Sequence, residues 1–287
     1  MFGCLLRAIV LLSVFAFHVE MTAAAMPHIS GLKVSPKMVA HRGAGDLTMP
    51  EASALAYSNA VATASDIVKL DVQFTKDGVA VMGHDVTLKR NMGWDVNIAD
   101  VTYDEILEKG RFLEDGIPGD QRIVRLDRAL SIVKSIPEFW IDFKDRKRFC
   151  AEQAERVLGA FLTADIDLSR VMLATFNTEA IRYFQSHYPQ VRRVLHCSFN
   201  VDVDKRQELQ AILGLCNKYG LFGLNMPVGK LQTHPDDIAM LKRHGLWISL
   251  WYVQDAETAL HYRAADVDAF VTDHISIVRK ALDTEGS

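Results

Sequence analysis

The stretch Ile67-Val68-Lys69-Leu70-Asp71-Val72-Gln73-Phe74-Thr75-Lys76-Asp77-Gly78-Val79-Ala80-Val81-Met82-Gly83-His84-Asp85 predicts a hairpin of two β-strands. Both runs are largely apolar, and the Asp77-Gly78 pair between them is a turn signal. Lys69 and Asp71 are two residues apart, so their side chains face the same side of the first strand. The second strand returns toward His84-Asp85, which places polar side chains at a strand end.

A second motif of this kind lies upstream, where Met38-Val39-Ala40 runs into His41-Arg42-Gly43. Apolar strands that end on polar residues present those residues at the mouth of a sheet, where substrates bind. Imidazole can both accept and donate a proton near neutral pH. Buried, hydrogen-bonded core histidines are the alternative, but two strand-end positions beside Arg42 and Asp85 favour catalysis. We therefore predict that His41 and His84 form an acid–base pair.

Strand-like and helix-like stretches alternate from residue 36 to 284, which predicts parallel βα units. The expected strands are 38–40, 66–73, 139–143, 171–175, 191–195, 223–226, 247–253 and 269–272, and the expected helices are 51–63, 126–135, 148–162, 178–187, 204–218, 235–244, 256–264 and 275–282. With the hairpin arm 79–82 counted as extra, the predicted fold is an α/β, TIM-type (β/α)8 barrel.

Residues 86–124 fit this alternation poorly and contain several glycines. We expect them to form a small insertion over the barrel mouth, after the hairpin, with one short helix near 103–108. The chain has 287 residues and 49% hydrophobic content, which suffices for one large core. We therefore predict a single barrel domain over residues 26–287.

Residues 1–25 have the pattern of a secretory signal peptide. Arg7 precedes the apolar stretch 8–17, and Ala23-Ala24-Ala25 offers a cleavage site of small residues. The apolar stretch is shorter than the ~20 residues that a membrane-spanning helix needs. We expect an exported protein, periplasmic or secreted, with no stable membrane span after removal of the signal.

The net charge and the cysteine spacing limit which binding partners and metal sites are expected. The net charge of −4 comes without a long basic run or a basic-aromatic patch, so nucleic acid is not an expected partner. Cys150, Cys197 and Cys216 remain after the signal, and their spacing matches no metal cluster. Buried free thiols are favoured over the one internal disulfide that three cysteines permit.

The motifs resemble those of the glycerophosphodiester phosphodiesterase family, which belongs to the barrel superfamily that includes the phosphoinositide phospholipases C. The shared elements, in order, are His41-Arg42-Gly43, Pro50-Glu51, Asp71, Thr75-Lys76-Asp77-Gly78, His84-Asp85 and Lys144, followed by weaker matches at Ala174-Thr175-Phe176, at 246–253 with Trp251, and at Val271-Thr272-Asp273-His274. The resemblance covers nearly the whole chain after residue 25. It implies a small-molecule phosphodiester substrate that is cleaved to glycerol 3-phosphate and an alcohol.

Three positions depart from the family pattern. Ala52 stands in place of Asn, and Asp142 stands in place of the Glu of the later Glu-x-Lys motif. Lys69 stands in place of the first Glu of Glu-x-Asp, which is a metal ligand in the family. The resemblance implies a divalent cation, calcium or magnesium, held by carboxylates, and Lys69 changes that ligand set.

Four further residues are candidates for substrate binding. Arg42 can clamp two phosphate oxygens with its planar fork, or pair with Glu51 or Asp71, and both can hold. Lys144 is a second phosphate contact or a solvated strand-end lysine. Glu51 could orient Arg42, favour a helix N-terminus or touch a glycerol hydroxyl. Trp251, with Phe176, could form an apolar substrate wall, although barrel packing explains these aromatic residues equally well.

Lys69 leaves three interpretations open. In the first, its ammonium pairs with Asp71 and Asp142 and replaces part of the metal's electrostatic role. In the second, a divalent ion still binds these two carboxylates, with water or Glu51 completing the shell. In the third, metal and activity are both lost, and a phosphodiester-binding remnant is left.

The favoured function is an exported phosphodiesterase, a phosphoric diester hydrolase that acts on glycerophosphodiesters by His/His acid–base catalysis. A transesterase, in which a substrate hydroxyl attacks and a cyclic phosphate forms, is the second hypothesis. A non-catalytic binder of phosphorylated ligands, motivated by Lys69, is the third.

Overall fold

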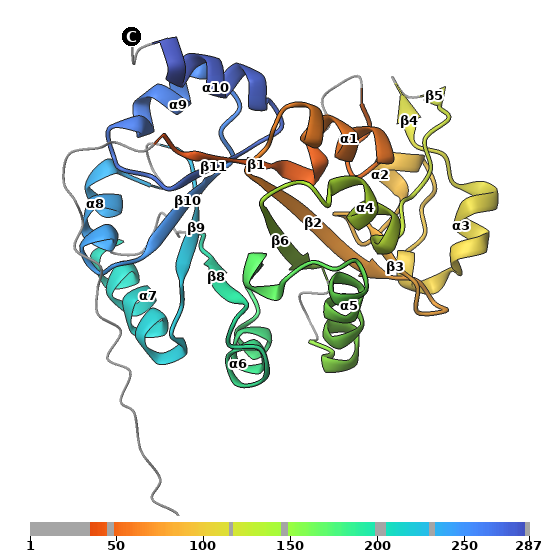
Figure 1. Ribbon diagram of the computed structural model, residues 1–287, viewed down its shortest axis with the longest axis horizontal. Coiled ribbons are helices and arrows are strands. Elements are labelled where there is room, and N and C mark those ends of the chain that lie inside the picture. The colour runs from red at the N-terminus through yellow and green to blue at the C-terminus, as the bar shows by residue number, and fades with distance from the viewer. Residues whose placement is uncertain are drawn as a thin grey trace, which may run out of the picture. The chain divides into compact units, whose positions relative to one another are not determined.

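A closed ring of eight parallel strands forms the centre of the computed structural model (Figure 1). The strands, in order around the ring, are β1 (Lys37–Ala40), β2 (Ile67–Phe74), β6 (Glu138–Phe143), β7 (Val171–Thr175), β8 (Arg192–His196), β9 (Gly223–Pro227), β10 (Trp247–Trp251) and β11 (Ala269–Thr272). The ring closes because β1 pairs in parallel with both β11 and β2. The structure describes residues 35–44, 49–114, 117–144, 149–198, 205–229 and 233–284, so the expected signal segment, 1–25, lies outside the described residues.

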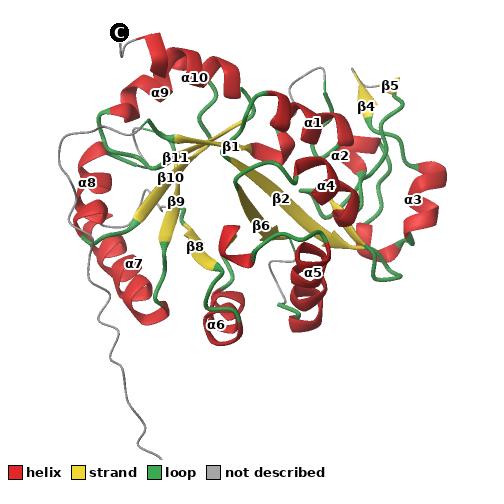
Figure 2. Cartoon of the chain, in the orientation of Figure 1, coloured by secondary structure: helices red, strands yellow, loops and turns green. Residues whose placement is uncertain are grey.

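A helix follows each strand of the ring, after the insertion in the case of β2, and the helices lie outside the strands (Figure 2). They are α1 (Ala54–Ala62), α4 (Leu126–Val133), α5 (Ala151–Thr163), α6 (Thr178–His187), α7 (Lys205–Tyr219), α8 (Pro235–Arg243), α9 (Ala256–Arg263) and α10 (Ile275–Thr284). This is the predicted TIM-type barrel, and the order of its elements is the predicted order. Most expected boundaries lie within one to three residues of the observed ones.

Side chains alternate between the two faces of the barrel wall, as the strand period requires. One set, which includes Val39, Ile67, Trp140 and Met172, forms a buried cluster that fills the barrel. The other set packs against the helices in the larger core. The Trp140 ring stacks on His196, with ring centroids 5.9 Å apart. The filled interior therefore supports the polar residues at the strand ends.

The hairpin arm is β3 (Ala80–Met82), which pairs antiparallel with β2. The expected Asp77-Gly78 turn is present, and Gly78 N–H donates to the carbonyl of Thr75. Beyond β3 the insertion contains α2 (Lys89–Met92), α3 (Tyr103–Lys109), β4 (Leu113–Glu114) and β5 (Ile117–Pro118). The sequence predicts α3 but misses α2 and the β4–β5 pair, because segments of four residues or fewer carry no readable periodicity.

The insertion has its own apolar cluster, which explains how it holds its shape beside the barrel. Its buried members are Val81, Leu88, Met92, Ile98, Val101, Ile106, Phe112 and Ile123. A capping box fixes the start of α3, since Thr102 Oγ1 accepts from Glu105 N–H while the Glu105 carboxylate accepts from Thr102 N–H.

The described cysteines, Cys150, Cys197 and Cys216, are all free thiols. Cys197 and Cys216 are buried, as expected, whereas Cys150 is half-buried. Burial raises the pKa of Cys197 to about 12, so this thiol stays protonated at neutral pH. Among the described residues, no helix combines the length and apolar character needed to cross a bilayer.

Two glycines give a stability test of the barrel register. A Cβ on Gly223 of β9 would lie 2.1 Å from the carbonyl oxygen of Trp247 on β10, whereas a Cβ on Gly214 of α7 would meet nothing within 4 Å. Gly223→Ala should therefore lower the free energy of unfolding by about 1–3 kcal/mol, because the strands must separate. Gly214→Ala should raise it by about 0.4–1 kcal/mol, because alanine favours the helix. Urea unfolding of both variants measures the two effects, and equal stabilities would contradict this register.

Candidate active site

The predicted site residues gather at one end of the barrel, around a cavity of about 460 Å³. The residues that line this cavity are His41, Arg42, Glu51, Lys69, His84, Arg90, Asp142, Lys144, Phe176, His196, Asn225, Trp251, Tyr252, Val271 and Asp273. All the predicted site residues are among them except Asp71, which is fully buried beside Lys69 and Lys144. The cavity joins residues from all eight barrel strands, or the loops after them, to His84 of the hairpin and Arg90 of the insertion.

The end of β1 turns sharply into the site. Arg42, Gly43 and Ala44 have φ values of 51°, 87° and 57°, so three successive residues are left-handed. For Arg42 and Ala44 this conformation costs backbone energy, which is commonly found at functional sites. Gly43 is also required for space, since a Cβ there would lie 3.0 Å from the backbone nitrogen of Tyr57. The turn brings both His41 and Arg42 to the cavity.

His41 is held by a carboxylate from the last strand end. Its Nδ1–H donates to Asp273 Oδ1 at 2.9 Å, and Gln254 Nε2–H donates to Asp273 Oδ2 at 2.6 Å. Because an ionised carboxylate only accepts, Nδ1 carries the proton and Nε2 of His41 remains free to accept one.

His84 is held in the same manner. Its Nδ1–H donates to Asp85 Oδ1 at 2.8 Å. Gln73 Nε2–H donates to the carbonyls of Gly83 and Asp85, which fixes the turn after β3. Asp85 therefore orients the His84 ring.

Arg90 of α2 connects the two halves of the site. Its Nη2 lies 2.7 Å from Glu51 Oε1, and its Nε lies 2.5 Å from Asp85 Oδ2. Glu51 in turn accepts from Arg42 Nη1 at 2.6 Å. A continuous chain thus runs from His84 through Asp85, Arg90 and Glu51 to Arg42. Burial raises the pKa of Glu51, but the two arginines outweigh this and bring it to about 2, so Glu51 is ionised at neutral pH.

Both histidines are neutral in the free protein at pH 7. Burial lowers the pKa of His41, against the hydrogen bond that His41 donates to Asp273, which raises it. Burial also lowers the pKa of His84, to about 4, with Asp71 opposing and Lys144 assisting. Neutral imidazoles with Nδ1 protonated present an Nε2 lone pair, as a general base requires.

Beneath the histidines lies a buried cluster of two carboxylates and two ammonium groups, Asp71, Asp142, Lys69 and Lys144, hereafter the four-charge cluster. Lys144 Nζ lies 2.9 Å from Asp71 Oδ1 and 2.6 Å from Asp142 Oδ2. Lys69 Nζ also contacts Asp71 Oδ1, and it lies 3.3 Å from Asp142 Oδ2. Side-chain exposures of 0–7% show that all four groups are withdrawn from bulk water.

The cluster sets the charge state of its members. Burial alone would raise the pKa of Asp71, but the attraction of Lys144 and Lys69 is the larger effect and brings this pKa well below the usual range. Burial lowers the pKa of Lys144, but Asp71 and Asp142 more than compensate and raise it. Burial also raises the pKa of Asp142, but Lys69 and Lys144 outweigh it and bring this pKa well below the usual range, so both carboxylates and Lys144 are ionised at neutral pH. Burial lowers the pKa of Lys69, with Asp71 and Asp142 opposing, so its ammonium form rests on the contacts with these two carboxylates.

His196 of β8 extends the cluster. Ser249 Oγ–H donates to Asn225 Oδ1 at 2.8 Å, so the Asn225 amide points its Nδ2–H toward His196 Nδ1, 2.9 Å away. His196 Nδ1 must then accept, which leaves its proton on Nε2, 3.4 Å from Asp142 Oδ2. This relay fixes Asp142 from a third direction.

Aromatic side chains form the sides of the cavity. The Tyr252 ring lies edge-on to His41 at 5.3 Å between centroids, and the Phe176 ring lies 4.9 Å from His196. Both are more than a third exposed. Trp251 also lines the cavity, as the expected apolar wall requires.

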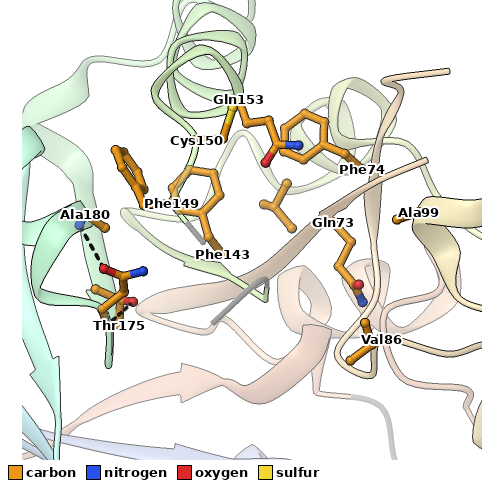
Figure 3. Close-up of a pocket in the computed structure, with 12 residues that line it drawn as sticks. Gln73, Phe74, Val86, Ala99, Phe143, Phe149, Cys150, Gln153, Thr175 and Ala180 are labelled. Carbon is orange, nitrogen blue, oxygen red and sulfur yellow. Dashed lines mark hydrogen bonds between the residues drawn. The ribbon is translucent and has the colours of Figure 1, made fainter. Parts of the chain in front are cut away.

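A second cavity, of about 170 Å³, lies outside the barrel wall (Figure 3). Phe143 and Phe149 line it, and two of its polar residues are engaged in structure, since Gln73 holds the hairpin end and Asn177 caps α6. No histidine, arginine or lysine is among its described lining residues, so the chemistry belongs to the larger cavity.

The profile of the glycerophosphoryl diester phosphodiesterase family matches residues 41–277. The chain belongs to this family. It is an enzyme of the glycerophosphodiester phosphodiesterase class. YhdW of Bacillus subtilis is 25% identical over 247 residues, which are 85% of this chain and 96% of the relative. A glycerophosphodiester phosphodiesterase of Caldanaerobacter subterraneus is 24% identical over 261 residues, with 85% and 98% covered.

Solved structures show the same fold. A phosphodiesterase of Oleispira antarctica, solved in complex with sn-glycerol-3-phosphate, gives a TM-score of 0.70 at 19% identity and covers 87% of this chain and 97% of its own. A glycerophosphodiester phosphodiesterase of Thermotoga maritima gives 0.65 at 21% identity, with 86% and 98% covered.

Members of the family generally use divalent cations, but the four-charge cluster does not fit one. Within the described ranges, no three His, Cys, Asp or Glu side chains are placed to share a metal ion. Asp71 Oδ2 is buried without a hydrogen-bond partner among described residues, yet one free oxygen is far from the six to eight oxygens that calcium takes. The predicted ligands Asp71 and Asp142 are instead paired with lysines.

Four residues of the site with charged, imidazole or amide side chains are absent from the predicted set: Arg90, His196, Asn225 and Asp273. Asp273 lies in a quoted motif, Thr272-Asp273-His274, so the strand-end rule could have found it. The other three depend on which distant strands and loops become neighbours. His196 in particular falls outside the expected strand 191–195, because β8 runs one residue further.

Arg90 is predicted to act as a positioning residue for His84 and Arg42, through Asp85 and Glu51. Arg90→Ala should lower kcat/KM by about tenfold to a hundredfold, because His84 and Arg42 both lose their shared anchor, and Arg90→Lys should not restore it, since an ammonium lacks the fork. Steady-state kinetics with glycerophosphocholine measure this. The exposed neighbour Lys89, replaced by Ala, is the control and should remain within about twofold. Normal kinetics for Arg90→Ala would exclude the positioning role.

Proposed function

We propose that this enzyme hydrolyses glycerophosphodiesters to glycerol 3-phosphate and an alcohol, with His41 and His84 as the proton-transfer pair. The observation that carries the proposal is that two imidazoles, each oriented by a carboxylate, line one cavity together with Arg42 and two lysines. The glycerol 3-phosphate complex of the Oleispira antarctica phosphodiesterase supports this product class. The substrate is a small molecule, and phosphate is its point of recognition.

The reaction needs one proton to leave the nucleophile and one to reach the leaving group. A base imidazole accepts a proton from water as its oxygen bonds to phosphorus, and an acid imidazolium donates a proton to the alkoxide as its bond to phosphorus breaks. Arg42 holds two non-bridging oxygens in its fork. Water is consumed, and the enzyme regains its protons when the two histidines exchange them with solvent.

The two environments suggest which histidine has which role. The partner of His84, Asp85, shares its charge with Arg90, whereas the partner of His41, Asp273, is held by the neutral amide of Gln254. A carboxylate that is not shared with a cation stabilises an imidazolium more strongly. We assign the acid to His41, which must take up a proton when the anionic phosphodiester enters the cavity, and the base to His84.

Leaving-group dependence tests this assignment. His84→Ala should lower kcat by about 10²–10⁴-fold with any substrate, because the base is always needed. His41→Ala should be equally damaging with glycerophosphocholine but much less so with a p-nitrophenyl diester, whose leaving group departs without protonation. Circular dichroism establishes that both variants are folded. The reverse pattern would exchange the roles, and near-normal turnover by either variant with glycerophosphocholine would refute the pair.

The pH profile gives a second test. His84 must be neutral to act as a base, and burial lowers its pKa to about 4, with Asp71, Lys144, Arg42 and Asp85 as the charged groups around it. The acidic limb of kcat/KM should therefore fall near pH 4, so activity persists at pH 5, where an ordinary histidine of pKa about 6.5 would already be protonated. An acidic limb near pH 6.5 would contradict the assignment.

Product analysis distinguishes hydrolysis from its alternatives. Phosphorus NMR of the reaction should show a phosphomonoester from the earliest time point. A five-membered cyclic phosphate would establish the transesterase instead. Binding of glycerophosphodiesters with no turnover would establish the non-catalytic remnant.

We also propose that residues 1–25 direct export to the periplasm or the exterior. Arg7, the apolar stretch 8–17 and the small residues at 23–25 support this. Fractionation of expressing cells, with N-terminal sequencing of the product, should find the chain outside the cytoplasm and shortened near residue 25. A full-length cytoplasmic product would contradict the proposal.

A further inference from the structure

We infer that the Lys69 ammonium does the electrostatic work of a divalent cation, so that this enzyme cleaves phosphodiesters without a metal cofactor. The inference rests on the proposed function and concerns the same cavity. It starts from the mismatch between the four-charge cluster and the ligand set that a hard cation needs.

The position of Lys69 is the first argument. Lys69 and Asp71 face the same side of β2, and Asp142 is the direct neighbour of Asp71 in the register of β6. Lys69 Nζ contacts one oxygen of each carboxylate, so it occupies the space between the two groups that would have to bind a metal. A cation bound there would have to displace a buried ammonium and leave it unpaired.

Charge conservation is the second argument. A glutamate and a divalent cation together carry one net positive charge, and a lysine ammonium carries the same charge alone. With Lys69, the cluster of two carboxylates and two ammonium groups is neutral. A divalent ion added to it would leave two uncompensated positive charges among groups that are at most 7% exposed.

Access to substrate is the third argument. Lys69, Asp142 and Lys144 all line the cavity that contains the two histidines and Arg42. The Lys69 ammonium donates one N–H to Asp71 and forms an ion pair with Asp142 at 3.3 Å, so a donor remains for a phosphate oxygen. Asp71 and Asp142 hold the ammonium in place before substrate arrives, so its charge stabilises the transition state without reorganisation.

The first experiment uses the wild-type enzyme. Release of glycerol 3-phosphate from glycerophosphocholine should be unchanged by chelator, by calcium and by magnesium, and elemental analysis should find no stoichiometric metal. Loss of activity in chelator, with recovery in either ion, would overturn the inference while the proposed function stands. Absence of activity under every condition would refute the proposed function itself. The calcium dependence of the Tm, described below, would then test whether the site binds a metal ion.

Three variants extend the test. Lys69→Met removes the ammonium at similar length and should lower kcat by about 10²–10³-fold, with no recovery in calcium or magnesium. Lys69→Glu supplies a third carboxylate and should create a calcium site, so that about 10 mM calcium raises its Tm by about 3 °C or more. Lys280→Glu makes the same charge change on the exposed side of α10 and should leave activity and metal response unchanged.

The thermal readout does not depend on activity. The wild-type Tm should not respond to calcium. A calcium-stabilised wild type, or a Lys69→Met variant with wild-type kcat, would overturn the inference. If the Lys69→Glu variant is unfolded in chelator and folds when calcium is added, this also shows that the variant binds calcium. Failure to fold in either condition leaves the wild-type and Lys69→Met results to decide.

Discussion

The pairing of Lys69 and Lys144 with Asp71 and Asp142 is the interaction on which the rest of the site depends. Four charges lie at the barrel mouth with almost no exposure to water. Removal of any one partner would leave an uncompensated buried charge, at a cost of about 3–5 kcal/mol. The cluster therefore constrains the ends of β2 and β6 to one register, and that register fixes where the hairpin presents His84.

The remaining residues of the site come from other parts of the chain and lie around the four-charge cluster. The strained turn at Arg42 and Gly43 brings in the phosphate clamp, and the insertion contributes Arg90, which ties the clamp to Asp85. The interior cluster around Trp140 supports His196 from below. A rigid cavity of this kind can place donors where charge develops, which is the largest contribution that a protein makes to phosphoryl transfer.

Much of this could be predicted from the sequence, because the strand period and the turn signals are local. The strand Val171–Thr175 and the helix Thr178–His187 were expected at their observed bounds. The first helix begins at Ala54 and not at residue 51, since Ser53 accepts from Ala56 N–H as the N-cap. His41, Arg42, His84 and Lys69 follow from motifs, but Arg90 and Asn225 do not. Their roles arise only from contacts between segments far apart in the chain.

The most direct test of a metal-free, lysine-based phosphate site is a crystal structure of the enzyme grown with glycerol 3-phosphate and manganese, with anomalous scattering measured. We predict a phosphate group between His41 and His84, in contact with Arg42 and Lys69, and no anomalous peak at Asp71 and Asp142. A manganese ion bound by these two carboxylates, with Lys69 turned away, would contradict it.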